Sequence, residues 1–200
     1  ERYLAHFRTI LNNSFDSDYI NDLIDTYSDF IDQYVYDDPQ KIYTYNQFLN
    51  EVNALKNFFS NRASFLWSNG EVSENGIEIL NVEYSVGNNS FAQPTSSDEV
   101  LISVTVDETQ DFPDEVNLYY GTGLVGLFAQ VPMVYGFSSG VYTYTIPPQN
   151  TGEYVRFYVE TVNANGSRVY EPEGAEHDVY IYQTKMENII IGDIVINEIM

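Results

Sequence analysis

Residues 121–126, Gly-Thr-Gly-Leu-Val-Gly, match the dinucleotide-binding pattern G-x-G-x-x-G. That pattern binds a pyrophosphate where a helix begins directly after it, because the helix N-terminus supplies the N–H donors. Residues 127–132 instead have the pattern of a strand that ends at a proline. A kinase glycine loop needs a lysine on the following strand, and no lysine lies between Lys56 and Lys185. We therefore expect a flexible hairpin loop and assign no catalytic or cofactor-binding residue.

The residues that most often bind transition metals are scarce. The chain has no cysteine, which excludes thiolate zinc sites, iron–sulfur clusters and disulfides. Its two histidines, His6 and His177, fall in different predicted domains, and neither has an evident nucleophile partner. We expect His6 to be packed or half exposed beside the apolar face of a helix, and His177 to lie in a solvated acidic loop. No metal ligand set is assigned.

Acidic residues cluster in the segment 107–115, Asp-Glu-Thr-Gln-Asp-Phe-Pro-Asp-Glu. Carboxylate oxygens are the ligands that Ca²⁺ prefers, so a calcium site between Asp107 and Asp114 is one interpretation. The spacing does not match an EF-hand, which needs ligands at fixed positions around a central glycine. A solvated acidic turn is the interpretation we favour.

Tyrosine is abundant, with 18 residues, and many fall on predicted strands. An exposed flat row of such side chains could stack on sugar rings, whereas a half-buried row would pack across strands. We favour packing, since Tyr142 and Tyr144 share a strand face with Ile146. The strand tyrosines considered are Tyr119, Tyr142, Tyr144, Tyr154, Tyr158, Tyr180 and Tyr182.

The composition restricts the possible partners. The chain has 30 acidic and 8 basic side chains, a formal net charge of -22, and 44% apolar residues. Nucleic acid and anionic membranes bind clustered lysine and arginine, so both are improbable partners. No apolar run approaches the ~20 residues that cross a bilayer, so we expect no direct membrane insertion. Because the sequence starts at Glu1 without an initiator methionine, we expect a globular fragment of a longer protein.

The hydrophobic periodicity divides the chain near residue 70. Apolar residues recur every three or four positions in 2–11 and 16–36, and again from Thr44, which has capping-box spacing to Gln47, to about Asn69-Gly70. After Gly70 the period becomes two. We predict strands at 77–86, 100–106, 116–120, 127–134, 141–146, 154–162 and, with a break near 172–174, 168–182.

These patterns predict separate helical and all-β domains, an α+β chain. Residues 1–70 form a three-helix segment, and residues 71–185 form an antiparallel sandwich of immunoglobulin or fibronectin type III shape. Residues 186–200 read as a linker and the first strand of a truncated further domain.

Three stretches resemble one multidomain arrangement. Residues 3–8, Tyr-Leu-Ala-His-Phe-Arg, with Asp37-Asp38, Tyr43-Thr44 and the helix 55–62, resemble the C-terminal end of the spore-coat protein H (CotH) kinase-like domain. The segments 116–120, 131–133, 144–147 and 152–160 resemble the fibronectin-like module found behind that domain in bacterial exported proteins. Residues 194–200 are similar to the opening strand of a lamin-tail domain.

The resemblance implies a structural role. The nucleotide-binding lysine and acidic residues of such a kinase would precede Glu1, so we expect this chain to be a non-catalytic accessory region, not an enzyme and without a cofactor. It would space or present neighbouring domains, its main partners, in a secreted or cell-surface protein. The alternative is a carbohydrate- or protein-binding module that uses exposed tyrosines or a calcium-binding acidic loop on the sandwich.

Overall fold

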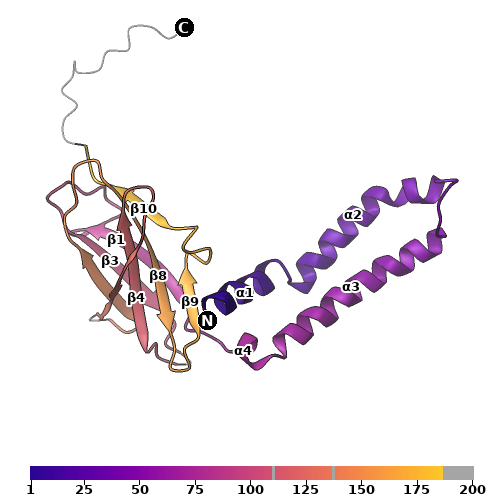
Figure 1. Ribbon diagram of the computed structural model, residues 1–200, viewed down its shortest axis with the longest axis horizontal. Coiled ribbons are helices and arrows are strands. Elements are labelled where there is room, and N and C mark those ends of the chain that lie inside the picture. Colours follow the sequence, from indigo (N-terminus) through magenta and orange to yellow (C-terminus); the bar gives the residue numbers. More distant parts are fainter. Residues whose placement is uncertain (110, 137, 187–200) are drawn as a thin grey trace, which may run out of the picture. The chain divides into compact units, whose positions relative to one another are not determined.

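The computed structural model describes residues 1–109, 111–136 and 138–186, and divides the chain into two compact units (Figure 1). The first unit comprises Glu1–Asn75 and the second Gly76–Met200. We call them the helical unit and the sandwich. The predicted fold class, helices followed by an antiparallel β-sandwich, is confirmed.

The helical unit contains α1 (Arg2–Asn13), α2 (Ser17–Asp37), α3 (Tyr45–Trp67) and the single turn α4 (Gly70–Ser73). The starts of α2, α3 and α4 are fixed by side chains that accept from otherwise unpaired backbone N–H groups. The Asp16 carboxylate accepts from Asp18 N and Tyr19 N, and the Thr44–Gln47 capping box is present as predicted. The sequence analysis missed α4.

The two long helices form an antiparallel hairpin (Figure 1). Lys56 of α3 forms an ion pair with Asp25 of α2, and Tyr45 Oη donates to Asp32 Oδ1 at 2.6 Å. Neither α2 nor α3 contains a buried residue, although both carry many large apolar side chains. The buried residues of this unit are Ala5, Leu11 and Val72, in α1 and α4.

The sandwich consists of two antiparallel sheets. One sheet has the order β2-β1-β3-β7-β6; the other has the order β10-β8-β4-β5, with β9 also paired to β8. The strands are β1 (Ile79–Val86), β2 (Asn89–Ser90), β3 (Val100–Val106), β4 (Glu115–Thr122), β5 (Ala129–Pro132), β6 (Val134–Tyr135), β7 (Val141–Ile146), β8 (Tyr154–Val162), β9 (Arg168–Glu171) and β10 (Tyr180–Gln183).

Two predicted strands are divided in the structure. The predicted strand 127–134 becomes β5 in one sheet and β6 in the other, and Met133 between them donates its N–H to Val116 O at 2.8 Å. The segment therefore passes from sheet to sheet. The predicted segment 168–182 is interrupted after Glu171, as predicted, and forms β9 and β10, which pair with opposite halves of β8. The strands β3, β7 and β8 have the predicted bounds.

The core lies between the two sheets and follows the twofold alternation of the strands. Val100, Ile102, Val104 and Val106 of β3 are all buried, as predicted. Facing them are Val155, Phe157 and Val159 of β8, and Leu118 of β4, each at most 1% exposed. This core is continuous and involves only sandwich residues.

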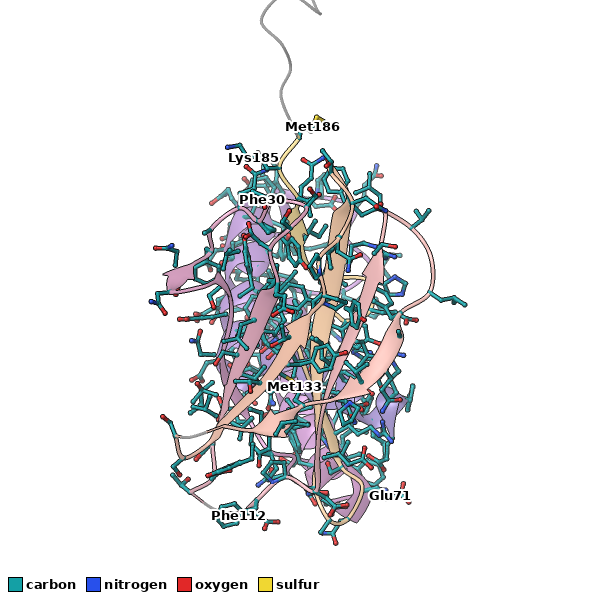
Figure 2. The ribbon with its side chains drawn as sticks, turned by 90° about the vertical axis from the view of Figure 1, so that its left-hand side faces the viewer. Phe30, Glu71, Phe112, Met133, Lys185 and Met186 are labelled. Carbon is teal, nitrogen blue, oxygen red and sulfur yellow. The ribbon has the colours of Figure 1, made fainter. Side chains whose placement is uncertain are left out.

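The chain enters and leaves the sandwich at opposite ends. Near the entry, Thr161 Oγ1 at the end of β8 donates to Ile77 O at 2.6 Å. Near the exit, Thr184 N donates to Glu153 O, next to the start of β8. Figure 2 shows Lys185 and Met186 at one end and Phe112, from the β3–β4 connection, at the other. Residues 187–200, including the predicted lamin-tail strand, lie outside the described residues.

Candidate functional site

The G-x-G-x-x-G segment comprises the last two residues of β4 and the hairpin loop that leads to β5, as predicted for a hairpin. Gly123 and Gly126 have φ values of +78° and +123°, which strongly favour glycine. A Cβ at Gly121 would lie 2.6 Å from Leu127 O, so the backbone of the loop returns close to its own start. The next element is the strand β5, so the loop has no helix N-terminus to bind a phosphate.

A buried arginine holds this loop. Arg156 of β8 donates from Nε to Gly123 O at 2.8 Å and from Nη2 to Gly126 O at 3.1 Å. Its guanidinium lies 4.6 Å from the centre of the Phe128 ring. The planar guanidinium thus fixes two carbonyls and one aromatic ring at once. We call this arrangement the Arg156 clamp; the sequence analysis missed it.

The clamped loop presents aliphatic side chains to solvent. Leu124 is 62% exposed, Val125 84% and Leu127 95%. Exposure of one apolar side chain is ordinary, but three within four residues of a fixed loop form a small apolar projection. We call these three residues the apolar tip.

A second network surrounds Glu160 of β8, which is 1% exposed. Its carboxylate accepts from Arg168 Nη1, Tyr170 Oη at 2.7 Å, Tyr119 Oη at 3.1 Å and Asn117 Nδ2 at 3.3 Å. The donors come from β4 and β9, the two strands that flank this part of β8. One buried carboxylate therefore ties three strands together on the sheet face opposite the core.

In this network the carboxylate of Glu160 and the guanidinium of Arg168 form an ion pair that stabilises the sheet. The hydrogen bond to Glu160 raises the pKa of Arg168 above its ordinary value. Burial and then the Glu160 charge raise the pKa of Tyr119 to about 12. Because four donors surround this carboxylate, it has little capacity left to act as a base or to bind a ligand.

The acidic segment after β3 is organised by hydroxyl groups. Glu108 accepts from Tyr135 Oη, Ser139 Oγ and Tyr142 Oη at 3.2 to 3.3 Å. Asp107 Oδ1 accepts from Thr109 N at 2.8 Å. Within the part of the chain that the structure describes, no three acidic or histidine side chains are grouped so that they could hold a metal ion.

The strand tyrosines pack rather than form an exposed row. Tyr119 and Tyr158 stack on each other, with ring centres 4.7 Å apart and planes at 5°. Tyr142 and Tyr144 pack against the core, as predicted, and so does Tyr180. Tyr158 and Tyr182 are 1% and 3% exposed, and Tyr154 is 36% exposed. These side chains do not offer a flat platform for sugar rings.

The two histidines belong to different units. His6 is half-buried on α1 of the helical unit, and His177 is exposed between β9 and β10 of the sandwich. These are the kinds of environment expected for the two residues. In the described residues, neither belongs to a group that could hold a metal ion.

A shallow hollow of about 790 Å³ lies at the turn between α2 and α3. Lys41 Nζ spans this turn and donates to Tyr36 O at 2.7 Å, which satisfies a terminal carbonyl of α2. Nearby Ile42 is 92% exposed and Tyr43 70%. The lining residues are Val35, Asp38, Gln40, Lys41, Ile42, Tyr43, Gln47, Phe48 and Glu51.

Among known protein families, a match is found to the helical unit. A family model described as "CotH kinase protein" matches residues 1–66, which supports a CotH-related fragment. No curated protein matches the chain significantly. Among solved structures, "Crystal structure of Br derivative BhCBM56" is 11% identical and covers 55% of this chain and 99% of that chain, with a TM-score of 0.34. At that score the two folds are not shown to be the same.

The described helices include none that is both long and apolar enough to cross a bilayer.

Proposed function

We propose that the chain is a non-catalytic structural region of an exported CotH kinase-like protein. The helical unit completes the fold of a neighbouring kinase-like domain, and the sandwich spaces or presents the domains on either side of it. Its partners are these neighbouring domains, and its location is the cell surface or the medium. The match of residues 1–66 to the CotH family supports this role.

One observation carries the proposal. The hairpin of α2 and α3 exposes large apolar side chains along both helices, and none of its residues is buried. Such helices gain little from packing on each other alone, because helical stability in proteins comes mainly from burying an apolar face. The hairpin therefore has the surface of a component that packs on further structure. The apolar side chains of α2 that are more than a third exposed are Tyr19, Leu23, Tyr27, Phe30, Ile31, Tyr34 and Tyr36.

The two polar networks fit a structural role. The Glu160 carboxylate is surrounded by four donors, and the Arg156 guanidinium is bound to two loop carbonyls. Groups engaged in this way stabilise a fold and do not activate a nucleophile or transfer a proton. The sandwich then serves as a rigid element that places its two ends about 30 Å apart, the length of a nine-residue strand.

Hydrogen exchange tests the docking role of the hairpin. In the 200-residue chain, amides of α2 and α3 should exchange much faster than those of β8, because their hydrogen bonds lack a covering core. In a longer polypeptide that carries the rest of a CotH kinase-like domain ahead of Glu1, the α2 and α3 amides should become protected. Equal protection of α2, α3 and β8 in the 200-residue chain would contradict the proposal.

A nucleotide assay tests the non-catalytic role. ATP with Mg²⁺ should leave the melting temperature of the 200-residue chain unchanged and should raise that of the longer polypeptide. ATP hydrolysis or protein phosphorylation by the 200-residue chain would overturn the assignment.

The alternative function, a binding module, is favoured by a feature of the sandwich and not of the helices. The tyrosines expected to contact a glycan are mostly packed, but the apolar tip of the β4–β5 loop is available to a protein. That surface does not depend on the role of the helical unit.

A further inference from the structure

The β4–β5 loop combines a fixed backbone with an apolar tip. A loop that only connects two strands can be mobile and polar. Here Gly123 O and Gly126 O are both bound by Arg156, whose side chain is withdrawn from solvent to do so. The loop then exposes Leu124, Val125 and Leu127. Fixing a surface before binding lowers the entropy lost on association, so this combination is that of a preorganised contact surface.

The loop is convex rather than hollow. Leu127 is 95% exposed and Val125 84%, so these side chains project from the surface instead of lining a cavity. A small molecule could cover only one side of such a projection, whereas a macromolecular surface could enclose it. Apolar anchors at the centre of a contact are the residues that contribute most to protein association.

Charge restricts the partner further. The chain has a formal net charge of -22, and the described sandwich contains three basic residues, Arg156, Arg168 and Lys185. Arg156 is bound to the loop and Arg168 to Glu160. The sandwich surface is therefore strongly acidic, which repels anionic lipid and disfavours a second copy of the same chain. Basic groups around an apolar contact would complement it.

We propose that Leu124, Val125 and Leu127 form a docking surface for a protein partner whose contact area is apolar and bordered by lysine or arginine. The Arg156 clamp positions these three side chains and does not itself meet the partner. The negative charge of the sandwich as a whole accelerates the encounter with a basic partner, and the apolar tip provides the affinity.

A synthetic amphipathic helix of leucine and lysine is the probe for this surface. Its affinity for the 200-residue chain is measured by fluorescence anisotropy at about 0.15 M salt, where surface charges are partly screened. The variant L124N/V125N/L127N should bind the probe at least about tenfold more weakly, because the apolar contact is lost. Leu80→Asn is the matched control: Leu80 is 57% exposed on β1, and its replacement should change the affinity less than about twofold.

The clamp is tested separately. Arg156→Lys keeps the charge and all three aliphatic side chains but cannot bind two carbonyls through one planar group. It should weaken probe binding about threefold by loosening the loop. A leucine–glutamate helix of the same pattern should not bind the unaltered chain.

A second measurement avoids any dependence on the folding of the triple variant. Because the chain has no cysteine, Val125→Cys can be labelled with an environment-sensitive dye at one position. The leucine–lysine helix should shift the emission of this dye to the blue, and a dye on Leu80→Cys should not respond.

Four outcomes would overturn the proposal. The probe could bind the triple variant as tightly as the unaltered chain, which would show that it binds elsewhere, by charge or on the exposed apolar side chains of α2 and α3. The leucine–glutamate helix could bind equally well, which would remove the basic border. Binding to phosphatidylcholine vesicles that the triple variant lacks would identify a bilayer as the occupant. Self-association in sedimentation experiments that the triple variant lacks would identify a second copy.

Discussion

The helical hairpin and the β-sandwich of this chain both carry many apolar side chains, but they bury them to very different extents. The sandwich encloses Ile102, Leu118 and Phe157 completely between its sheets. The helices α2 and α3 bury no residue, and Phe30 of α2 remains 74% exposed. Apolar content therefore does not make a folded unit self-sufficient; the arrangement must also place those side chains against one another. The sandwich is complete in this respect, whereas the hairpin leaves its apolar side chains exposed.

The same substitution made in both regions gives the largest expected contrast. Phe157→Ala removes a side chain that is 1% exposed and should lower the free energy of unfolding of the sandwich by about 3 to 5 kcal/mol. Phe30→Ala should change stability by less than about 0.5 kcal/mol, because that ring is already solvated. Urea unfolding followed by circular dichroism measures both. Similar losses for the two variants would refute the contrast.

Ion pairs allow a second comparison between the regions. Glu160→Gln keeps the shape of the side chain but removes the charge that faces Arg168, and should cost about 2 kcal/mol, since the Arg168 side chain is 35% exposed and retains some hydration. Asp25→Asn breaks the exposed pair with Lys56 and should cost between about 0 and 1 kcal/mol. The shift of each variant's urea midpoint measures the loss of stability. A larger loss of stability for Asp25→Asn than for Glu160→Gln would contradict this comparison of the two ion pairs.

A helix cap gives a smaller effect that should remain local. Thr44 Oγ1 accepts from Gln47 N and starts α3. Thr44→Ala should destabilise the hairpin by about 1 kcal/mol, because it leaves an N–H at the helix start without its partner. Hydrogen exchange should become faster in the first turns of α3, while β8 keeps its protection. If the amides of both α3 and β8 lost protection from exchange, the two units would unfold together.

A further effect is a pH dependence from Tyr119. Its pKa in the folded chain is about 12, against an ordinary value of 10.0, and burial is the main cause. Between these values the unfolded chain releases the phenol proton and the folded chain retains it, so stability falls as the pH rises from about 10 to 12. Tyr119→Phe should reduce this fall, measured as the change in urea midpoint between pH 9 and pH 11. An unchanged slope would show that Tyr119 does not contribute to it.

Much of the fold follows from local patterns in the sequence. The capping box at Thr44 and Gln47 fixed the start of α3, and twofold alternation identified the inward face of β3. The passage of one segment between two sheets at Met133 was not predictable in this way, because residues 127–134 form a mostly apolar run that has the composition of one strand. The short helix α4 was missed because a single turn has no periodicity to detect.

The candidate sites were harder to predict than the fold. The glycine loop was identified correctly as a hairpin, yet nothing in the loop itself indicates that Arg156, 30 residues away from Gly126, would bind it. A usable signal was the alternation in β8, where Arg156, Tyr158 and Glu160 share the face opposite Val155, Phe157 and Val159. Three large or charged side chains in a row on a strand face suggest polar contacts across strands. Their partners depend on strand order, which local pattern does not determine.

The entry and exit of the chain at opposite ends of the sandwich determine how the domain would respond to tension. A pull applied at Gly76 and Met186 is directed along the strands, and so across their ladders of hydrogen bonds. Such a load strains many hydrogen bonds of the β1–β3 and β8–β10 pairs simultaneously, instead of opening them one after another from an end. The sandwich would therefore resist such a load with little extension.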